Sequence, residues 1–349
     1  MERRKLGTKC LVALCSLIFV AGVFSITPQA ISADKKIVWN VSLWGGPRTS
    51  TSQVHAWAEK MEQNTNGRWK IKLHYGAVLA PPKEQLDGLK AGLFQGCCIF
   101  TQLHPGKLPL HTVSDLPFIS PDKFINSTQL LMELWKHPAL KTELLKWNAV
   151  PLLPHANPPY VIMSNKPIRK VADFNGLRIR VGGEFGSLLK QFGAVPAIVP
   201  APSIYESLQR GVVDAVASVW TAGIADYKQH EVTKYAIPSL SLGTNFFYFL
   251  ANKDAWDALP QEFRDYSMDF YYKAPMLWAY QYKKKDQKNI PMFKKTLEFI
   301  EFPASEKEKL LAKAKEVYRR WAEDKERKGL PGNEVLQYYL KKRKGLVDY

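Results

Sequence analysis

Apolar and amphipathic segments alternate along the first part of the chain. Residues 37–43 are mostly apolar, which predicts a buried strand. Apolar side chains then recur with helical spacing over 54–61, and the following Gly67 predicts where this helix ends. Apolar and polar residues alternate over 69–75, as in a half-buried strand. The order strand, helix, strand is typical of an α/β fold.

The same order of elements returns later in the chain. A helix predicted over 83–91 ends at Gly92 and precedes a strand at 97–100. The second round comprises strands over 160–164 and 177–181, a helix over 185–192, a helix ending at Gly211 and a strand over 212–217. This weak internal echo indicates two similar α/β lobes with a cleft between them, and one ordinary α/β sheet is the alternative.

Helical patterns dominate the end of the chain. Residues 261–288 form one long aromatic-rich pattern, which predicts a helix. A second apolar stripe over 310–321 predicts another helix that ends near Gly329. The longer helix has the length to brace two lobes.

The N-terminal segment has the pattern of a secretory signal peptide. Four basic side chains lie in the first nine residues, and an almost unbroken apolar run over 10–26 follows. Small residues at Ala30, Ser32 and Ala33 then precede a charged stretch, so we expect cleavage after Ala33 and a secreted, periplasmic protein. The alternative is a membrane anchor that is retained, because the run approaches the length of a spanning helix.

The charge balance favours anionic small molecules over nucleic acids as partners. The chain contains 49 Lys and Arg residues against 32 Asp and Glu residues, for a formal net charge of +17. Basic residues alternate with acidic ones along the sequence, and no recognised nucleic-acid-binding motif accompanies them. We therefore predict a solvated basic surface and no nucleic-acid partner.

The chain shows no motif for catalysis, metal binding or a cofactor. The seven His residues lack metal-ligand spacing, and neither a nucleophile elbow nor a phosphate-binding loop occurs. Cys97 and Cys98 are adjacent, too close for an ordinary disulfide, so we expect two buried reduced thiols. We predict no catalytic residue, no metal and no cofactor, and thus a protein that is not an enzyme.

Two arginines in the strand predicted over 177–181 are the best candidates for binding chemistry. Alternation places Arg178 and Arg180 on the same face of the strand. Arg180 lies at the strand end, beside a glycine-rich stretch over 182–186, where its planar donors can clamp a carboxylate. The alternative for either arginine is an ordinary surface position.

Residues 171–181, with the sequence VADFNGLRIRV, favour a binding role for this strand over an ordinary surface position. They resemble the signature segment of the solute-binding proteins of tripartite ATP-independent periplasmic (TRAP) transporters, the DctP-like family. Other segments agree with this family in order and spacing, over 67–71, 79–84, 105–110, 116–118, 204–215 and 252–260. The resemblance covers nearly all of the chain after the signal peptide.

The resemblance implies a two-lobed α/β fold of the periplasmic-binding-protein type, with mixed sheets and a long late helix spanning both lobes. It implies one lobe over 34–158 plus 246–288, and a second lobe with the C-terminal helices over 159–245 plus 289–349. It also implies that the lobes close around one small organic acid, which the protein delivers to a membrane permease driven by an ion gradient. The alternatives are a binding component of an ABC importer, a ligand sensor and, less favoured, an exported enzyme.

The resemblance further implies that Arg180 clamps the ligand carboxylate and that Arg178 is structural. Many members carry a second ligand-facing arginine where this chain has Tyr160, and polar residues where it has Ala217, Ser218 and then Trp220. We therefore expect a monocarboxylate with an apolar or aromatic body, bound by Arg180, Tyr160, Trp220, Trp44, Asn245 and Phe246. The alternative for each aromatic residue is ordinary core packing.

Overall fold

The computed structural model describes residues 36–121 and 123–346. The predicted signal peptide over 1–33 lies outside this part of the chain. Among the described residues, no helix has both the length and the apolar character needed to cross a membrane.

The first sheet combines strands from both the beginning and the middle of the chain. Its order is β2-β1-β3-β10-β4, in which β1 runs parallel to β2 and β3 while β10 runs antiparallel to β3 and β4. The strands are β1 (Ile37–Ser42), β2 (Trp69–His74), β3 (Gly96–Phe100), β4 (Ala149–Ala156) and β10 (Phe246–Asn252). We call this sheet and its covering helices lobe I.

The helices of lobe I cover the sheet through apolar side chains at helical spacing. In α1, Val54, Trp57 and Met61 are fully buried and pack on the indoles of Trp39 and Trp69. The helices are α1 (Ser52–Asn64), α2 (Gln85–Lys90), α3 (Phe124–Leu134), α4 (Pro138–Leu145) and α7 (Lys253–Asp257). Short 3₁₀ helices are η1 (Thr49–Thr51), η2 (Pro82–Glu84), η3 (Thr101–Leu103) and η4 (His111–Asp115).

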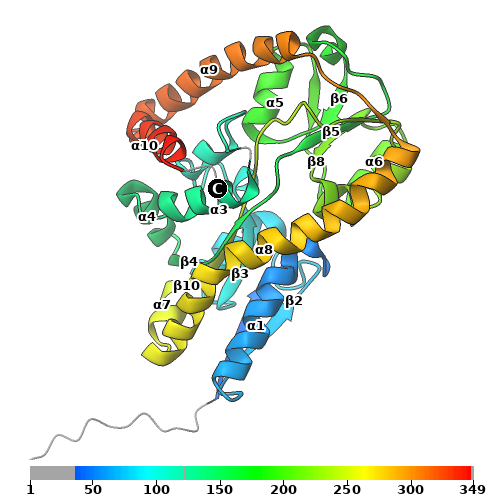
Figure 1. The fold of residues 1–349 in the computed structure, drawn as a ribbon. Helices are drawn as coiled ribbons and strands as arrows, with labels where there is room; N and C mark the ends of the chain where they lie inside the picture. The colour runs from blue at the N-terminus through cyan, green and yellow to red at the C-terminus, as the bar shows by residue number, and fades with distance from the viewer. Residues whose placement is uncertain (1–35, 122, 347–349) are drawn as a thin grey trace, which may run out of the picture. The chain divides into compact units, whose positions relative to one another are not determined.

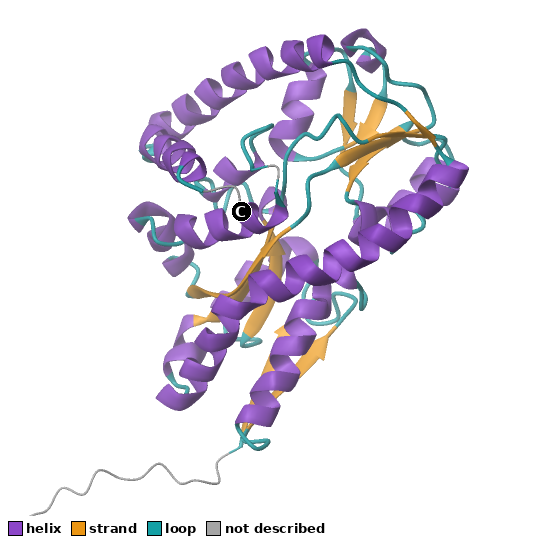
Figure 2. Cartoon of the chain, in the orientation of Figure 1, coloured by secondary structure: helices purple, strands orange, loops and turns teal. Residues whose placement is uncertain are grey.

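The second sheet also mixes parallel and antiparallel pairs. Its order is β11-β9-β5-β8-β6-β7, with β6 parallel to β7 and β8, and β5 antiparallel to β8 and β9. The strands are β5 (Val161–Ser164), β6 (Arg178–Arg180), β7 (Val195–Ala197), β8 (Ala215–Ser218), β9 (Tyr235–Ile237) and β11 (Glu298–Phe299). Figure 2 shows the two sheets as separate groups of strands. We call this second sheet and its helices lobe II.

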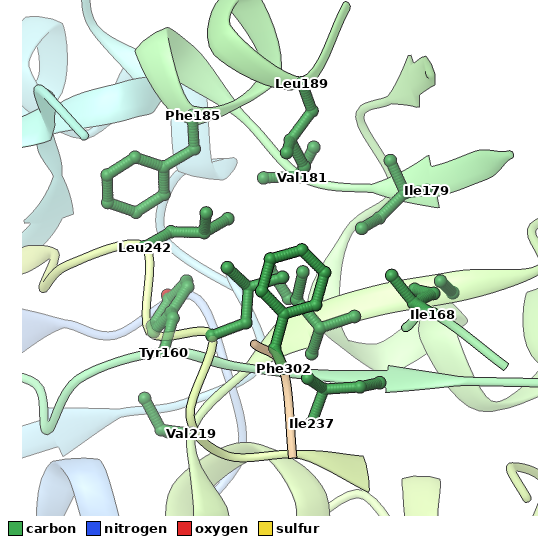
Figure 3. Packing of buried hydrophobic residues seen from close by; sticks show 14 of the residues in the cluster. Tyr160, Ile168, Ile179, Val181, Phe185, Leu189, Val219, Ile237, Leu242 and Phe302 are labelled. Carbon is green, nitrogen blue, oxygen red and sulfur yellow. The ribbon is translucent and has the colours of Figure 1, made fainter. Parts of the chain in front are cut away.

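Lobe II contains mostly short helices. The α-helices are α5 (Gly183–Lys190) and α6 (Ile204–Gln209), and η7 (Trp220–Ala225) is a π-helix. The 3₁₀ helices are η5 (Val171–Phe174), η6 (Ala201–Ser203) and η8 (Gln229–Glu231). The core of this lobe includes Phe185, Leu189 and Phe302, which Figure 3 shows around the sheet.

Three helices complete the chain. Helix α8 (Gln261–Thr296) packs on α1, α3 and β4 of lobe I and on η7 of lobe II, and Figure 1 shows it running past both sheets. Helix α9 (Ala304–Arg327) packs on α5, and α10 (Gly332–Lys344) folds back on α9 and α3. The structure therefore confirms the α/β class, the two mixed sheets and a long late helix that contacts both lobes.

Several predicted boundaries differ from those in the structure. Helix α8 runs to Thr296, beyond the predicted end at residue 288, and contains Pro291 in its last two turns. Strand β8 begins at Ala215 instead of residue 212, since the chain turns at Gly211, where φ is +66°. The pattern did not predict α3, α4, β4, β10 or α10. Cys97 and Cys98 are free and buried, as predicted.

Candidate functional site

A cavity of about 520 Å³ is lined by residues of both lobes. It lies where strands of the two sheets end: β1 and β3 lead to it from lobe I, and β6 and β8 lead to it from lobe II. Carboxyl ends of parallel strands are the usual ligand-binding edge of an α/β sheet. The lining includes Trp44, Arg48, Phe100, Gln102 and Phe247 from lobe I, and Tyr160, Arg180, Val199, Ser218 and Tyr227 from lobe II.

Arg180 places a positive charge in this largely apolar cavity. Its strand is held between β7 and β8, and its Nε donates a hydrogen bond to the carbonyl oxygen of Val199 at 3.0 Å. Burial lowers the pKa of Arg180, and the phenols of Tyr160 and Tyr227 oppose that shift. Within the described residues no carboxylate forms an ion pair with Arg180. A half-buried cation in an apolar cavity is costly without a counter-charge, so the site favours an anionic ligand.

Tyr160 lies beside Arg180 at the start of β5. The side chain is 8% exposed, and its backbone N–H donates to the carbonyl oxygen of Gly243 at 2.8 Å. Its ring packs edge-on against Phe185, and Figure 3 shows it close to Val219 at the border of the lobe II core. Burial raises the pKa of Tyr160, while the charge of Arg180 opposes that increase. The phenol is therefore a neutral donor beside the guanidinium.

Arg178 has a different environment from Arg180. Its Nε and Nη2 donate to the two oxygens of Asp214 at 3.0 and 2.8 Å, and its backbone N–H donates to the same carboxylate. This pairing holds the pKa of Asp214 at about 2, well below its ordinary value. Arg178 is 46% exposed at the side chain and does not line the cavity. Its position agrees with a structural role.

Aromatic rings form the lobe I wall of the cavity. The indole of Trp44 stacks on Phe247 with centroids 5.7 Å apart and an interplanar angle of 18°. The ring of Phe247 in turn contacts that of Phe100, with centroids 5.0 Å apart. The guanidinium of Arg48 lies 4.7 Å from the centroid of the Trp44 ring. This wall offers flat apolar surface with a cation at one end.

The structure does not bring Trp220, Asn245 or Phe246 to the lining of the cavity. Trp220 stacks on Phe293 and Phe299, at 5.8 and 5.6 Å, because the π-helix turns it toward the end of α8 and β11. Its ring therefore contributes to packing within lobe II.

Asn245 and Phe246 come just before Phe247 in the chain, but only Phe247 lines the cavity. Phe246 points into the apolar cluster on the opposite side of β10, whereas its neighbour Phe247 faces the cavity. Asn245 is fully buried behind the wall, where its Oδ1 accepts a hydrogen bond from Nε2 of Gln102 at 3.0 Å. Of the six predicted site residues, Arg180, Tyr160 and Trp44 share the cavity.

Contacts between the two lobes at the cavity include a close approach and a pair of hydrogen bonds. A Cβ added to Gly182 would lie 2.7 Å from Oε1 of Gln102, so the glycine-rich stretch meets a lobe I side chain. On another side of the cavity, the carboxylate of Asp226 accepts hydrogen bonds from the backbone N–H of Thr49 at 2.9 Å and from its hydroxyl at 3.3 Å. The first contact joins two lining residues, and the second joins the sequence neighbours of Arg48 and Tyr227, which line the cavity.

Arg48, Gln102, Tyr227 and Phe247 line the cavity but were not predicted from the sequence. Arg48 and Gln102 follow the carboxyl ends of β1 and β3, and this position is a signal that could have identified them. Tyr227 and Phe247 carry no such signal, because a π-helix and an antiparallel strand place them. Among the described residues, no group of three His, Cys, Asp or Glu side chains is arranged to hold a metal ion.

Two mixed sheets that border a cavity with an arginine and aromatic walls define a two-lobed solute-binding protein. The DctP family, described as bacterial extracellular solute-binding protein, family 7, matches residues 43–325, and the chain belongs to this family. Its members are periplasmic solute-binding proteins of TRAP transporters, which are not enzymes. The resemblance inferred from the sequence is confirmed.

One known relative of this chain is a dicarboxylate-binding protein. The chain is 28% identical to the C4-dicarboxylate-binding periplasmic protein DctP of Rhodobacter capsulatus over 212 residues, which cover 59% of this chain and 62% of that protein. The match therefore spans less than two thirds of the relative.

Two solved structures share the fold. A TRAP solute-binding protein from a marine metagenome, specific for aromatic acid ligands, is 20% identical, with a TM-score of 0.79 and coverage of 90% of this chain and 100% of that chain. Another from Rhodoferax ferrireducens T118, in complex with copurified benzoate, is 21% identical, with a TM-score of 0.78 and coverage of 89% and 98%. At these identities the likeness establishes the fold alone.

Proposed function

We propose that this protein captures a small organic carboxylate in the periplasm and delivers it to a TRAP-type membrane permease. The observation that carries the proposal is Arg180, a guanidinium inside the cavity that pairs with no carboxylate of the described chain. A planar guanidinium matches the two oxygens of a carboxylate. Tyr160 adds a neutral donor beside it.

The walls of the cavity favour a ligand with an apolar or aromatic body. Trp44, Phe100 and Phe247 present stacked rings on one side, and Val199 contributes apolar surface on the other. An aromatic ligand ring gains both area burial and ring contacts on such a wall. Binding of aromatic acids by two proteins of the same fold supports this class of ligand, and the dicarboxylate relative supports recognition of carboxylates.

A thermal-shift screen followed by calorimetric titration tests the proposal. We expect benzoate-like acids to raise the melting temperature by about 5 °C at about 100 times Kd, because a ligand of the folded state stabilises it by mass action. The matched amides, which have the same bodies without the charge, should produce no shift. Binding of succinate or malate without binding of any aromatic or branched acid would overturn the proposed ligand class.

The proposed location and delivery need separate measurements. N-terminal sequencing of exported protein should show a mature chain that begins at Asp34, and an intact Met1 would contradict a cleaved signal peptide. Uptake of the identified ligand should require both this protein and a permease of the TRAP type. Uptake that depends on ATP hydrolysis instead would contradict the proposed partner.

A further inference from the structure

Arg48 is a second cation of the cavity, and it comes from the other lobe. Its guanidinium carbon lies 4.7 Å from the ring centroid of Trp44 in lobe I and 6.0 Å from that of Tyr227 in lobe II. Nη1 donates to the carbonyl oxygen of Gly46 at 3.1 Å. No carboxylate of the described residues forms an ion pair with Arg48. Most N–H groups of the Arg48 guanidinium therefore donate to no carboxylate of the described residues.

The backbone around Arg48 is fixed by hydrogen bonds. The N–H of Arg48 donates to Oγ1 of Thr51 at 3.0 Å, and the Thr51 hydroxyl donates back to the carbonyl oxygen of Arg48 at 2.9 Å. The next residue, Thr49, is bonded to Asp226 of lobe II. Nζ of Lys285 also donates to the Thr49 hydroxyl at 2.8 Å. Arg48 therefore projects from a turn that these hydrogen bonds fix, and Glu84 is a carboxylate elsewhere in the cavity lining.

The two cavity arginines come from different lobes. Arg180 is anchored to Val199 in lobe II, whereas Arg48 caps the aromatic wall of lobe I over Trp44. A single monoanion leaves one of two guanidinium charges without a counter-charge when water is excluded, which costs free energy. A ligand with two anionic groups neutralises both charges. The family resemblance indicated that Tyr160 replaces a second ligand-facing arginine. The structure places another arginine, Arg48, in the loop that follows β1.

We propose that Arg48 forms a second anion-binding subsite and that the ligand is an apolar or aromatic acid with two acidic groups. This inference rests on the proposed function, because it requires that Arg180 bind the first carboxylate. The ring of the ligand lies on the wall formed by Trp44 and Phe247. Its second acidic group receives the donors of Arg48.

Calorimetric titration with a matched set of acids tests the subsite. Benzoate, isophthalate and terephthalate share one ring and differ in the second carboxylate. We expect the wild-type protein to bind at least one of the diacids about tenfold or more tightly than benzoate, the scale of one charge-assisted contact. Arg48→Gln should abolish that preference, because it should weaken the diacid about tenfold more than it weakens benzoate. Arg178→Gln, which alters an arginine outside the cavity, is the matched control and should preserve the preference.

The outcomes separate this inference from the proposed function. Equal affinity of the wild-type protein for benzoate and both diacids would overturn the second subsite while leaving carboxylate capture intact. Equal weakening of benzoate and diacids in Arg48→Gln would also overturn it, since both arginines would then grip one carboxylate. If no acid binds, or if Arg180→Gln binds every acid like the wild type, the proposed function itself fails. Arg48→Lys keeps the charge and serves as the second variant if Arg48→Gln melts at a lower temperature than the wild type.

Discussion

The two ends of strand β6 carry the same residue type in opposite settings. Arg178 meets Asp214 through three hydrogen bonds near the surface, while Arg180, two residues on, reaches the cavity and bonds to a carbonyl oxygen. Alternation puts both on one face of the strand, but the strand runs from the solvent to the cavity along its length. Whether a counter-charge is built into the protein decides which arginine is available for a ligand.

The difference should appear most clearly when each arginine is removed. We expect Arg180→Ala to weaken binding of the true ligand by about 3–5 kcal/mol, the scale for removing one partner of a buried charge pair. Arg180→Lys should cost somewhat less, because it keeps the charge but loses the paired geometry. Arg178→Ala should leave the affinity within about twofold. Calorimetric titration of folded variants, checked by circular dichroism, gives these values.

The opposite result would reverse the comparison. If folded Arg180→Ala binds like the wild type and Arg178→Ala does not, the roles of the two ends of β6 are exchanged. If neither change affects affinity, the ligand does not bind through a carboxylate at this strand.

Two tryptophans extend the comparison from charge to apolar contact. Trp44 lines the cavity, whereas Trp220 stacks on Phe293 and Phe299 inside lobe II. We expect Trp44→Ala to weaken binding of an aromatic acid by about 1–3 kcal/mol, since a ligand ring loses its stacking surface. Trp220→Ala should instead lower the free energy of unfolding by about 2–3 kcal/mol.

Titration and denaturant unfolding of both variants separate these effects. The sequence had predicted ligand contacts for both Trp44 and Trp220. A loss of affinity confined to Trp220→Ala, with stability unchanged, would support that assignment and contradict the one from the cavity geometry.

The smallest expected effect concerns the pair at the outer end of β6. The pKa of Asp214 is about 2 in the folded protein because of Arg178, below the ordinary value of 3.8. A depressed pKa stabilises the fold above the pKa of the unfolded chain, and this stabilisation is lost as the pH falls toward 2. Asp214→Asn should therefore lower the free energy of unfolding by about 1 kcal/mol at pH 7, after allowance for the exposure of Arg178.

Urea unfolding from pH 7 to pH 2 measures this contribution. The difference between wild type and Asp214→Asn should shrink below about pH 4. Lys166→Ala, which removes a second and more exposed partner of Asp214, is the control and should change stability by less than about 0.5 kcal/mol. A difference that does not depend on pH would show that the carboxylate is not stabilised by its charge.

Periodicity predicted elements whose apolar pattern is set by local packing, and it predicted less where distant segments decide. The strand that became β1 and the helix that became α1 are readable because their buried side chains recur at fixed spacing. Strand β10 was missed since all seven of its residues are buried between β3 and β4, which leaves no alternation to detect. Asn245 and Phe246, at the start of this strand, were therefore predicted at the ligand in place of Phe247.

The same limit applies to the site. Arg180 could be identified because a characteristic segment surrounds it, and Tyr160 because it departs from a family pattern. Arg48 follows the carboxyl end of β1, which marks it as a candidate, but the contact of its neighbour Thr49 with Asp226 of the other lobe is contained in no local pattern. The pairing of Arg178 with Asp214 likewise joins residues far apart in the sequence.

The close approach of Gln102 to Gly182 makes this glycine a spacer between the two walls of the cleft. A methyl group at this position would come within 2.7 Å of Oε1 of Gln102, so the end of that flexible side chain would have to shift. The same amide donates through Nε2 to Oδ1 of Asn245, and a shift would strain or break this hydrogen bond. Because Gln102 and Gly182 both line the cavity, the change would alter the shape of the cavity wall without adding a polar or charged group. The missing side chain at residue 182 thus leaves the Gln102 amide its place beside the ligand site.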